Sequence, residues 1–430
     1  MTYEEALSFI HGIPRFGKKP GLKRIVNLLE RLGNPQKQLR FIHVAGTNGK
    51  GSTCTMLSYI LHEAGYRTGL YISPFVIDFR ERMQINNEMI PQDELAVLTK
   101  EVYTHWHAME DEGLPPSEFE VVVSIALLYF ARQKCDIVVL EVGMGGRFDS
   151  TNVIDVPLAC AITSIGLDHM QYLGNTLEAI AAEKCGIIKP GSVAVTAPNQ
   201  DVGALAVIMK HCAETGNDLL IPNSAEIISE SIEGSRIFYG NKEYFVPLAG
   251  RHQVDNALIV LELCRAIGDR GITLTYDQIR GGMAKTTFPS RLERFGQSPL
   301  ILMDGAHNEP GAKALAVAMP LLAGRNIHAI ISMSADKDAA SSLGLVLPYC
   351  KSVIVSAAQS NFKAAEAKNL LPFAKEYCSD ITLEEQSDKA FAKGLARCQK
   401  NDVLLIFGSL YLTSELRPLA IEAGEKQKYI

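Results

Sequence analysis

A glycine-rich segment near the N-terminus has the composition of a nucleotide-phosphate loop. In FIHVAGTNGKGSTCTML (41–57), glycines 46, 49 and 51 surround Lys50, between a predicted strand and a predicted helix. Glycines let backbone N–H groups converge on phosphate oxygens, the helix N-terminus adds positive potential, and a lysine supplies a mobile charge. The spacing differs from the general GxxxxGK[ST] pattern, because a glycine follows the lysine. The alternative is a glycine-rich turn that only begins a helix.

Three further residues could ligate the Mg²⁺ that phosphoryl transfer requires. Magnesium prefers hard oxygen ligands and keeps several waters. Ser73 ends the second predicted strand, Glu141 follows the apolar run DIVVL, and His169 lies in TSIGLDHMQYLG. Open α/β sheets bind their ligands at the carboxyl ends of the strands. The alternatives are a loop-capping carboxylate and an ordinary loop histidine, although an acid after DIVVL is costly to bury without a partner.

The elements that would position these residues follow an α/β rhythm. Short β-branched runs alternate with longer helical patterns, which predicts parallel strands joined by helical crossovers. We expect strands at 41–46, 68–73, 136–143, 158–166 and 192–197. We expect helices at 50–63, 92–109, 118–134 and 252–267. Short polar alternations with turn signals between 218 and 248 predict a small antiparallel sheet.

A second, smaller α/β domain of Rossmann type is predicted after the irregular segment 286–299. There the rhythm restarts, with expected strands at 300–305, 327–334, 352–357 and 402–409 between alanine-rich helices. We therefore predict an ATP-binding domain at 1–290 and a Rossmann-like domain at 291–430.

Composition excludes several classes of protein. The 430 residues are 47% hydrophobic, which allows a sizeable core, and the net charge of -6 lacks the basic excess of a nucleic-acid binder. No apolar stretch reaches a membrane span, and the opening MTYEEALSFI does not resemble a signal peptide. Nine scattered cysteines without a CxxC pair favour a reducing compartment, with most of them as small core residues. We expect a cytoplasmic monomer with no membrane or nucleic-acid partner.

Eight motifs recur in a fixed order along nearly the whole chain: HVAGTNGKGS (43–52), LYISPF (70–75), EVGMGGRFDSTN (141–152), ITSIGLDHMQYLGNTLEAIAAEKCGIIKPG (162–191), GRHQVDNA (250–257), SRLERF (290–295), DGAHN (304–308) and GSLYL (408–412). Their combination and order resemble the folylpolyglutamate synthase family, which is related to the Mur peptidoglycan ligases. The resemblance implies a Mur-ligase-like P-loop ATPase domain followed by a Rossmann-like ligase domain.

The resemblance also implies an ATP-dependent amide ligase that adds L-glutamate to the γ-carboxylate of tetrahydrofolate or a one-carbon derivative. A carboxylate is a poor acyl donor, so the γ-phosphoryl group of ATP is first moved onto it, giving an acyl phosphate and ADP. The amine of glutamate then attacks, and a tetrahedral intermediate collapses to amide and phosphate. Positioning and charge stabilisation would supply most of the catalysis.

Matching the family residue by residue implies four sets of site residues. The ATP-binding set is Gly46, Thr47, Asn48, Gly49, Lys50, Gly51, Ser52, Asn256, Arg291 and Asp304. The metal set is Ser73, Glu141, His169 and Lys184. The catalytic set is Lys50, Lys184 and His307. The folate-binding set is Ser117, Phe119, Glu120, Phe148, Asp149 and Ser150.

Three of these assignments keep an alternative. Family members carry an N6-carboxylated lysine at the position of Lys184, and a carbamate would suit a magnesium site, but an ordinary exposed helix lysine is the simpler interpretation. His307 would orient phosphate or the attacking amine, or it would buttress its loop. Phe119 and Phe148 would stack on the pteridine ring, although aromatic residues at such places are more often core.

Three other functions compete with this one. Some family members also join glutamate to dihydropteroate, but PRFGKKPGLKRI (14–25) lacks the acidic residue that we associate with that second activity. A nucleotide-binding switch should lack a metal carboxylate or the second-domain residues Arg291 and Asp304. A Mur-type ligase of cell-wall precursors should carry an N-terminal UDP-binding domain, for which a phosphate loop at residue 46 leaves no room.

Overall fold

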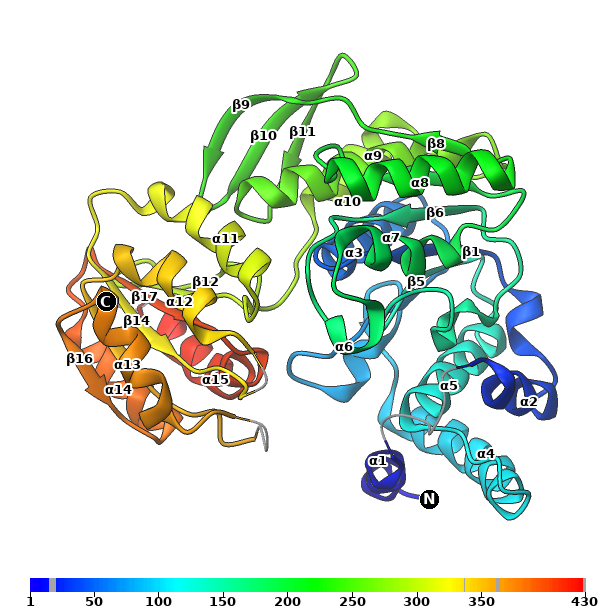
Figure 1. Ribbon diagram of the computed structural model, residues 1–430, viewed down its shortest axis with the longest axis horizontal. Helices are drawn as coiled ribbons and strands as arrows, with labels where there is room; N and C mark the ends of the chain where they lie inside the picture. The colour runs from blue at the N-terminus through cyan, green and yellow to red at the C-terminus, as the bar shows by residue number, and fades with distance from the viewer. Residues whose placement is uncertain (15–20, 336, 361–363, 428–430) are drawn as a thin grey trace. The chain divides into compact units, whose positions relative to one another are not determined.

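The computed structural model describes residues 1–14, 21–335, 337–360 and 364–427, and Figure 1 shows their arrangement into helices and strands. The described chain separates into two compact units. The first comprises residues 1–225 and 255–286, and the second comprises 226–254 and 287–430. The second unit thus includes residues 226–254, which precede the predicted boundary. The domain limits 1–290 and 291–430 stay a prediction.

The first unit is built on an eight-stranded sheet in the order β4-β3-β2-β5-β1-β6-β7-β8. Six strands are parallel, and β3 and β4 form an antiparallel edge that the sequence pattern does not predict. The five strands predicted for this unit are confirmed. The bounds are β1 (Phe41–Ala45), β2 (Thr68–Tyr71), β3 (Met83–Ile85), β4 (Glu88–Met89), β5 (Ile137–Glu141), β6 (Ala159–Ile162), β7 (Val193–Thr196) and β8 (Asp218–Leu220).

Helices cover this sheet, and the predicted helices at 50–63, 92–109, 118–134 and 252–267 are all confirmed. The α-helices are α1 (Tyr3–Gly12), α2 (Lys23–Arg31), α3 (Lys50–Glu63), α4 (Gln92–Asp111), α5 (Glu118–Arg132), α6 (Met170–Leu173), α7 (Leu177–Lys184), α8 (Val202–Thr215), α9 (Arg251–Gly268) and α10 (Tyr276–Ala284). Short 3-10 turns are η1 (Pro35–Gln38), η2 (Phe79–Arg82), η3 (Ser150–Val153) and η4 (Cys185–Ile187).

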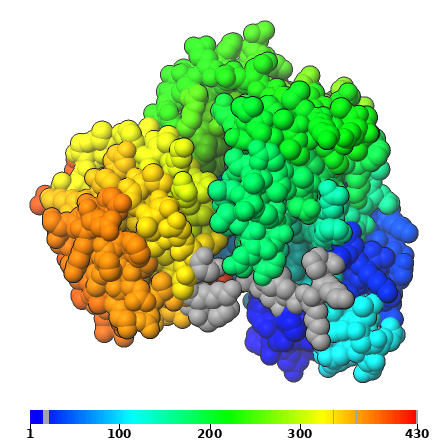
Figure 2. All heavy atoms as spheres, in the orientation of Figure 1, coloured from blue at the N-terminus to red at the C-terminus, as the bar shows by residue number. Residues whose placement is uncertain are grey.

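The N-terminal helices belong to the core of the first unit. Phe9 of α1 meets Trp106 of α4 edge to face, with 5.5 Å between the ring centroids, and the two helices lie side by side in Figure 2. The indole N–H of Trp106 donates to the carbonyl of Pro116 at 2.8 Å, so this buried polar group is satisfied. His105 and His107 therefore flank a core residue.

The antiparallel sheet is smaller than predicted. Residues 218–220 form β8, which pairs in parallel with β7 of the large sheet, so the predicted start of the small sheet at 218 is wrong. A strand of only three residues has no sequence pattern that distinguishes a parallel from an antiparallel sheet, so only its hydrogen-bonded neighbour shows which sheet it belongs to. The small sheet contains β9 (Glu226–Ser231), β10 (Gly234–Tyr239) and β11 (Lys242–Val246), and it is grouped with the second unit.

The second unit contains a six-stranded sheet in the order β12-β13-β17-β14-β15-β16, parallel except for β12. The four predicted strands are confirmed, while β12 and β16 are additions. The strands are β12 (Glu293–Phe295), β13 (Leu300–Met303), β14 (Ile327–Ile331), β15 (Ser352–Val355), β16 (Ile381–Leu383) and β17 (Val403–Phe407). The helices and turns are α11 (Glu309–Ala318), η5 (Met319–Leu322), α12 (Ala339–Val346), η6 (Leu347–Tyr349), α13 (Ala367–Tyr377), α14 (Ser387–Arg397) and α15 (Leu410–Lys426).

Both faces of this second sheet are buried, as a Rossmann-like fold requires. Alternate strand residues divide between two hydrophobic clusters: Leu302 and Leu405 pack with α11, α12 and α13, whereas Met303 and Ile406 pack with α14 and α15. The predicted α/β class with two parallel sheets and a small antiparallel sheet is confirmed.

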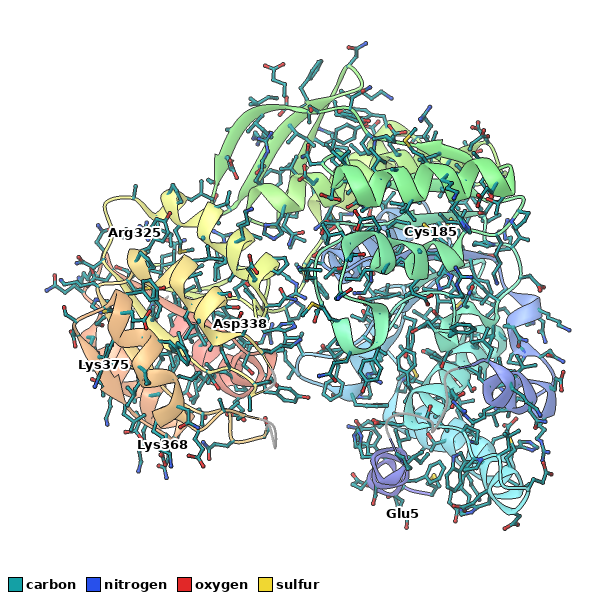
Figure 3. All side chains as sticks on the ribbon, viewed as in Figure 1. Glu5, Cys185, Arg325, Asp338, Lys368 and Lys375 are labelled. Atoms are coloured by element: carbon teal, nitrogen blue, oxygen red, sulfur yellow. The ribbon has the colours of Figure 1, made fainter. Side chains whose placement is uncertain are left out.

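The cysteines are core residues, as predicted. All nine are free thiols, and eight are buried, among them Cys185 beneath the helices of the first unit (Figure 3). Burial raises the pKa of the Cys185 thiol to about 12, so it stays protonated and unreactive at neutral pH. Within the described residues, no helix combines the length and apolar character that a membrane crossing needs.

Helix α3 carries the phosphate loop at its N-terminus, and its C-terminal half is held by α10. A Cβ atom on Gly282 of α10 would lie 2.4 Å from the Cα of Ile60 and 2.8 Å from the carbonyl oxygen of Tyr59. The backbones of the two helices therefore meet where α10 has no side chain. At the neighbouring Gly281, a Cβ would meet only the side chain of Glu63, at 3.2 Å or more.

We predict that Gly282→Ala lowers the free energy of unfolding by about 2 kcal/mol, since overpacking against backbone exceeds the gain in helix propensity. Gly281→Ala, its matched control, should raise that free energy by up to about 1 kcal/mol, because it gains propensity without a backbone clash. Urea unfolding of the three proteins measures both. Equal stabilisation by the two substitutions would contradict close packing of α3 on α10.

Candidate nucleotide and acyl-transfer site

The phosphate loop follows β1, and its first glycine, Gly46, packs against Thr163, the residue directly after β6. A Cβ on Gly46 would lie 1.7 Å from the Thr163 hydroxyl oxygen, so only glycine fits there. That hydroxyl donates to the carbonyl of Asn48 at 2.7 Å, and the backbone N–H of Thr47 donates to Ser164 at 2.9 Å. The loop is thus fastened to the segment after β6 before any ligand binds.

The end of the loop is shaped by a second glycine. Gly49 is the N-cap of α3 and has a φ of 86°, a left-handed conformation that glycine adopts without strain. A Cβ there would lie 2.2 Å from the side-chain oxygen of Asn256 on α9. Asn256 is buried against this turn, which places one predicted nucleotide ligand beside the phosphate loop. The N-terminus of α3 therefore opens directly behind the loop, as an anion site requires.

Two lysines converge on the same carbonyl group. The ammonium group of Lys50 donates to the carbonyl oxygens of Gly46 at 3.1 Å and Thr47 at 3.2 Å, and that of Lys184 donates to Gly46 at 2.8 Å. Lys184 is 3% exposed, which rejects the simpler interpretation of an exposed helix lysine. Burial, and then the charge of Lys50, lower the pKa of Lys184 to about 7. A substantial part of Lys184 is therefore a neutral amine at neutral pH.

Glu141 is the buried carboxylate at the end of β5. One of its oxygens accepts the backbone N–H of Ser73 at 2.9 Å, which joins the ends of β5 and β2. Both Glu141 and Lys50 act electrostatically on the buried thiol of Cys54 in α3, so both lie near the first part of this helix. Two predicted metal ligands are thus adjacent, and they stand close to the phosphate loop.

The donor chemistry at this place fits magnesium. A serine hydroxyl and a carboxylate are hard oxygen ligands, and Mg²⁺ is usually held by one or two carboxylates together with water and phosphate. Among the described residues, no three His, Cys, Asp or Glu side chains gather into a group that could hold a metal ion. His169 lies exposed on the loop before α6 with a φ of 50°. Its neighbour Asp168 acts electrostatically on Lys184, so this loop faces the same lysine.

The loop 143–152 is folded around the carboxylate of Asp149. The backbone N–H groups of Met144 and Thr151 donate to its two oxygens, at 2.9 Å and 3.0 Å. Asp149 and Ser150 are buried, whereas Phe148 is 54% exposed. Burial raises the pKa of Asp149, although these hydrogen bonds oppose the shift. Phe148 is therefore a surface aromatic, and its predicted alternative as a core residue is wrong.

Ser117 and Glu120 have a local structural task. The Ser117 side chain caps α5, and the Glu120 carboxylate accepts the backbone N–H of Ser117 at 2.7 Å in a capping box. Glu120 also pairs with Arg24 of α2 at 3.0 Å. Phe119 lies over Gly143, where a Cβ would approach its ring to 2.4 Å. The start of α5 thus supports the loop 143–152, and substrate contact by these three residues stays a prediction.

In the second unit, Asp304 ends β13 and organises the turn that follows. Its oxygens accept the backbone N–H groups of Leu292 at 2.9 Å and Ala306 at 2.8 Å. Burial raises the pKa of Asp304, and the nearby positive charge of Arg291 opposes that shift. The ring nitrogen Nδ1 of His307 lies 2.7 Å from the carbonyl of Gly305, so Nδ1 carries the proton and donates. Contacts of these residues with ATP stay a prediction.

Sequence reasoning missed several residues that hold the site together. Thr163 fastens the phosphate loop, His43 of β1 contacts Thr151 at 2.8 Å, and Lys189 donates to the carbonyls of Asn152 and Ile154. His43 and Thr163 are polar residues in or directly after otherwise apolar strands, which is a signal that could have found them. Lys189 has no such signal, because exposed lysines are common in loops.

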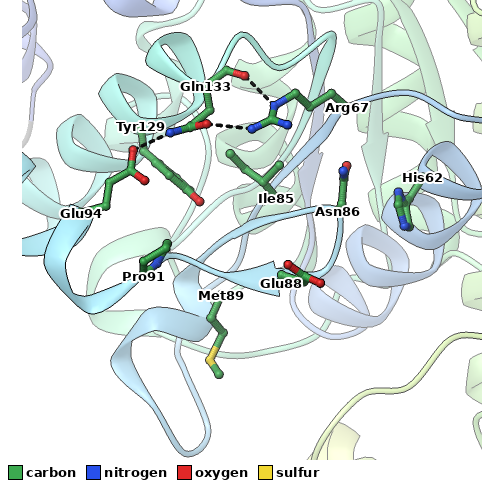
Figure 4. A pocket seen from close by; sticks show the side chains of 10 residues that line it. All are labelled: His62, Arg67, Ile85, Asn86, Glu88, Met89, Pro91, Glu94, Tyr129 and Gln133. Atoms are coloured by element: carbon green, nitrogen blue, oxygen red, sulfur yellow. Dashed lines mark hydrogen bonds between the residues drawn. The ribbon is translucent and has the colours of Figure 1, made fainter.

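A hollow of 360 Å³ lies on the opposite edge of the large sheet, near the amino end of β2. The side chain of Gln133 bridges Arg67 and Glu94 there, donating to Glu94 at 2.7 Å and accepting from Arg67 at 2.7 Å (Figure 4). None of the predicted site residues lines this hollow. Three of its polar side chains, Arg67, Gln133 and Glu94, are hydrogen-bonded to one another.

The geometry of the first unit supports transfer of an anionic group. Glycine backbone, a helix N-terminus and two lysines meet at Gly46, with a carboxylate and a serine at the neighbouring strand ends. Such a place binds polyphosphate, accommodates a divalent cation and stabilises charge that develops on a transferred phosphoryl group. A nearly neutral amine at Lys184 adds a nucleophile that can react with small electrophiles.

Comparison with known protein families identifies two domains. Residues 116–264 match the Mur ligase middle domain, and residues 290–410 match the Mur ligase, glutamate ligase domain.

Relatives match from end to end. A protein of Bacillus subtilis (strain 168) named dihydrofolate synthase/folylpolyglutamate synthase is 37% identical over 431 residues, which cover 97% of this chain and 98% of the relative. The crystal structure of folylpolyglutamate synthase from Thermotoga maritima has a TM-score of 0.86 at 31% identity and covers 99% of both chains. E. coli FolC in complex with DHPP and ADP has a TM-score of 0.86 at 27% identity and covers 98% of both chains.

The lowered pKa of Lys184 predicts a pH-dependent cost of folding. Between about pH 7, its folded value, and about 10.4, its unfolded value, the unfolded chain binds more protons. Wild-type stability should therefore rise across this range relative to Lys184→Met, which carries no titrating group. Urea unfolding in carbonate-free buffer at several pH values measures the difference. The exposed Lys210→Met control should run parallel to wild type, and a constant difference for Lys184→Met would contradict the buried amine.

Proposed function

The chain belongs to the folylpolyglutamate synthase/dihydrofolate synthase family of Mur-type ligases, and from this premise we propose that it adds L-glutamate to the γ-carboxylate of a tetrahydrofolate derivative at the expense of ATP. In enzyme terms it is a tetrahydrofolate synthase, an acid–amino-acid ligase. One observation carries the proposal: the ammonium groups of Lys50 and Lys184 meet at the carbonyl of Gly46 in the glycine-rich loop, in a chain of which 97% matches such a synthase.

The reaction proceeds in two steps that balance. The substrate carboxylate attacks the γ-phosphorus of ATP, so that a C–O–P bond forms, the β–γ bridge breaks, and ADP leaves. The glutamate amine then attacks the acyl carbon, loses a proton, and expels inorganic phosphate as the amide forms. Neither step needs an oxidant or a reductant. Charge develops on phosphoryl oxygens in the first step and on the carbonyl oxygen in the second.

The residues of the first unit match the first step. The loop from Gly46 to Ser52 binds the phosphates, with Lys50 redirected from its loop carbonyls to the ATP oxygens. Asn256 holds the turn at Gly49, and Arg291 and Asp304 of the second unit are proposed nucleotide contacts. Ser73, Glu141, His169 and a modified Lys184 would hold Mg²⁺, which supplies charge neutralisation for the phosphates. His307 would orient the phosphate or the amine.

We include an N6-carboxylated Lys184 in this proposal. A free ammonium group beside a magnesium site would repel the cation, whereas a carbamate is an oxygen ligand. The nearly neutral amine that burial creates is the form that reacts with carbon dioxide, and the carbamate forms as the amine nitrogen bonds to carbon and releases one proton. The carbonyl of Gly46, 2.8 Å away, would accept the remaining N–H.

The folate substrate is proposed to bind along the loop 143–152 and the start of α5, with exposed Phe148 as a stacking face and Asp149, Ser150, Ser117, Phe119 and Glu120 as the remaining contacts. Dihydrofolate synthase activity on dihydropteroate is the alternative, since the B. subtilis relative is named for both activities. The segment 14–25, on which we base single activity, lies partly outside the described residues, at 15–20. A cytoplasmic monomer that uses only small-molecule substrates completes the proposal.

We predict that the purified protein releases phosphate from ATP with Mg²⁺ and L-glutamate when tetrahydrofolate or 5,10-methylenetetrahydrofolate is present. Mass spectrometry should show products heavier by glutamate residues. Lys50→Ala should be inactive, because it removes the mobile charge of the phosphate loop, and exposed Lys285→Ala should keep wild-type activity. Addition of glutamate to dihydropteroate as well would establish the bifunctional alternative. No gain on any substrate, despite tight ATP binding, would refute the proposed function.

The carbamate has its own test. Protein equilibrated with ¹³C-bicarbonate should show one carbamate ¹³C resonance that is absent from Lys184→Arg, because arginine lacks a nucleophilic neutral amine. Lys189→Arg is the matched control, since Lys189 is also partly buried with a lowered pKa yet lies away from the phosphate loop, and it should keep the resonance. A wild-type spectrum without the signal would contradict carboxylation and leave the ligase proposal standing.

A further inference from the structure

A buried histidine of β1 reaches the loop 143–152 from beneath. His43 has no exposed surface and occupies the middle of the central strand, between Leu140 of β5 and Cys160 of β6. Every other residue of β1 is apolar. Burial lowers the pKa of His43 to about 3, so the imidazole is neutral throughout the physiological range. A polar ring at such a position is costly unless it makes a specific hydrogen bond.

The hydrogen bond of His43 is to the hydroxyl of Thr151, with 2.8 Å between Nε2 and Oγ1. The same hydroxyl lies 2.6 Å from Oδ1 of Asp149. A threonine hydroxyl has one proton, and a carboxylate oxygen can only accept, so this proton is donated to Asp149. The Thr151 oxygen must then accept the Nε2–H of His43. The tautomer of His43 is thereby assigned, and its Nδ1 is a buried lone pair without a partner among the described residues.

The Asp149 carboxylate connects this hydrogen bond to the rest of the loop. Its other oxygen accepts the backbone N–H of Met144 at 2.9 Å, and Oδ1 also accepts that of Thr151 at 3.0 Å. A single row of hydrogen bonds therefore runs from the central strand, through Thr151 and Asp149, to both ends of the segment that presents the exposed ring of Phe148. Rotation of the Thr151 hydroxyl away from Asp149 would leave the buried carboxylate with one donor fewer.

We propose that His43 is a positioning residue for the folate substrate: its Nε2–H orients the Thr151 hydroxyl, which in turn holds the Asp149 carboxylate and the loop 143–152 in the shape that binds folate. The inference rests on the proposed function for the identity of the substrate, whereas the hydrogen-bonded row rests on the structure. His43 touches no reacting atom, so its effect should fall on substrate binding more than on turnover.

The first test compares KM values. His43→Leu removes the N–H donor and Thr151→Val removes the hydroxyl, each leaving an apolar side chain of similar size. Each substitution should raise the KM for tetrahydrofolate about tenfold, the effect of one buried hydrogen bond. The KM for ATP should change less than twofold. His43→Gln, whose amide N–H can occupy the position of Nε2, should restore most of the wild-type KM.

Two controls separate this role from general destabilisation. His328→Leu removes another buried strand histidine that also contacts a hydroxyl, that of Ser352 at 2.7 Å, and it should leave the KM for tetrahydrofolate unchanged. In the double variant His43→Leu/Thr151→Val, the KM should be no higher than in either single variant, because both substitutions break the same row. Additive effects would overturn the proposal.

A second readout does not depend on activity. Amide hydrogen exchange at Met144 and Thr151 should accelerate in His43→Leu, whereas exchange in the phosphate loop should stay as in wild type. Unchanged exchange in the loop 143–152 would overturn the proposal. Faster exchange in the phosphate loop alone would also overturn it, because His43 would then act through Gly46. If wild type ligates no folate yet exchange responds as expected, the proposed function and the folate role of His43 fail, while its hydrogen-bonded support of the loop 143–152 stands.

Discussion

The close contact between Gly46 and Thr163 governs the chemistry of this protein. Because no Cβ fits at Gly46, the phosphate loop lies flat against the segment after β6, and its carbonyl is turned towards the interior. The ammonium groups of Lys50 and Lys184 both donate a hydrogen bond to this carbonyl oxygen. Burial of Lys184, and then the charge of Lys50, lower the pKa of Lys184 to about 7, so that the amine is partly neutral at pH 7. The phosphate loop thus contacts, at Gly46, a buried lysine 138 residues away in the chain.

Buried carboxylates in both units follow a common rule. Glu141, Asp149 and Asp304 lie at strand ends or in the loops that follow them, and each accepts at least one backbone N–H group. Backbone donors compensate desolvation without adding a mobile side chain, so the loops are held in one shape. In the proposed ligase, the lysine charges then serve the polyphosphate and the carboxylate oxygens serve the cation. The result is a site whose framework is rigid while its charged groups remain available.

The parallel sheet explains why these groups meet. Strand carboxyl ends collect the phosphate loop, Ser73, Glu141 and the loop 143–152 at one edge of the first unit. The opposite edge contains the hollow at Arg67, where polar side chains neutralise one another. The candidate site residues therefore lie at the carboxyl ends of the strands, as is typical of open α/β folds, and the hydrogen-bonded side chains of the hollow lie at the amino ends. Away from the site, Gly282 allows α10 to pack closely against the helix of the phosphate loop.

Sequence alone determined the α/β class, nearly all parallel strands, and the family, because β-branched periodicity and ordered motifs are properties of the chain read locally. It also singled out Lys50 and Glu141 by residue type and position, and Lys184 through the family resemblance. Tertiary structure decided what those residues experience. The burial of Lys184, the separation of exposed Phe148 from packed Phe119, and the row from His43 to Asp149 depend on contacts between residues as far apart as 138 positions. Likewise, β8 joined the large sheet because of pairing with β7, which no local pattern encodes. Desolvation and hydrogen bonding act through space, so their consequences for charge and orientation could not be predicted from a linear pattern.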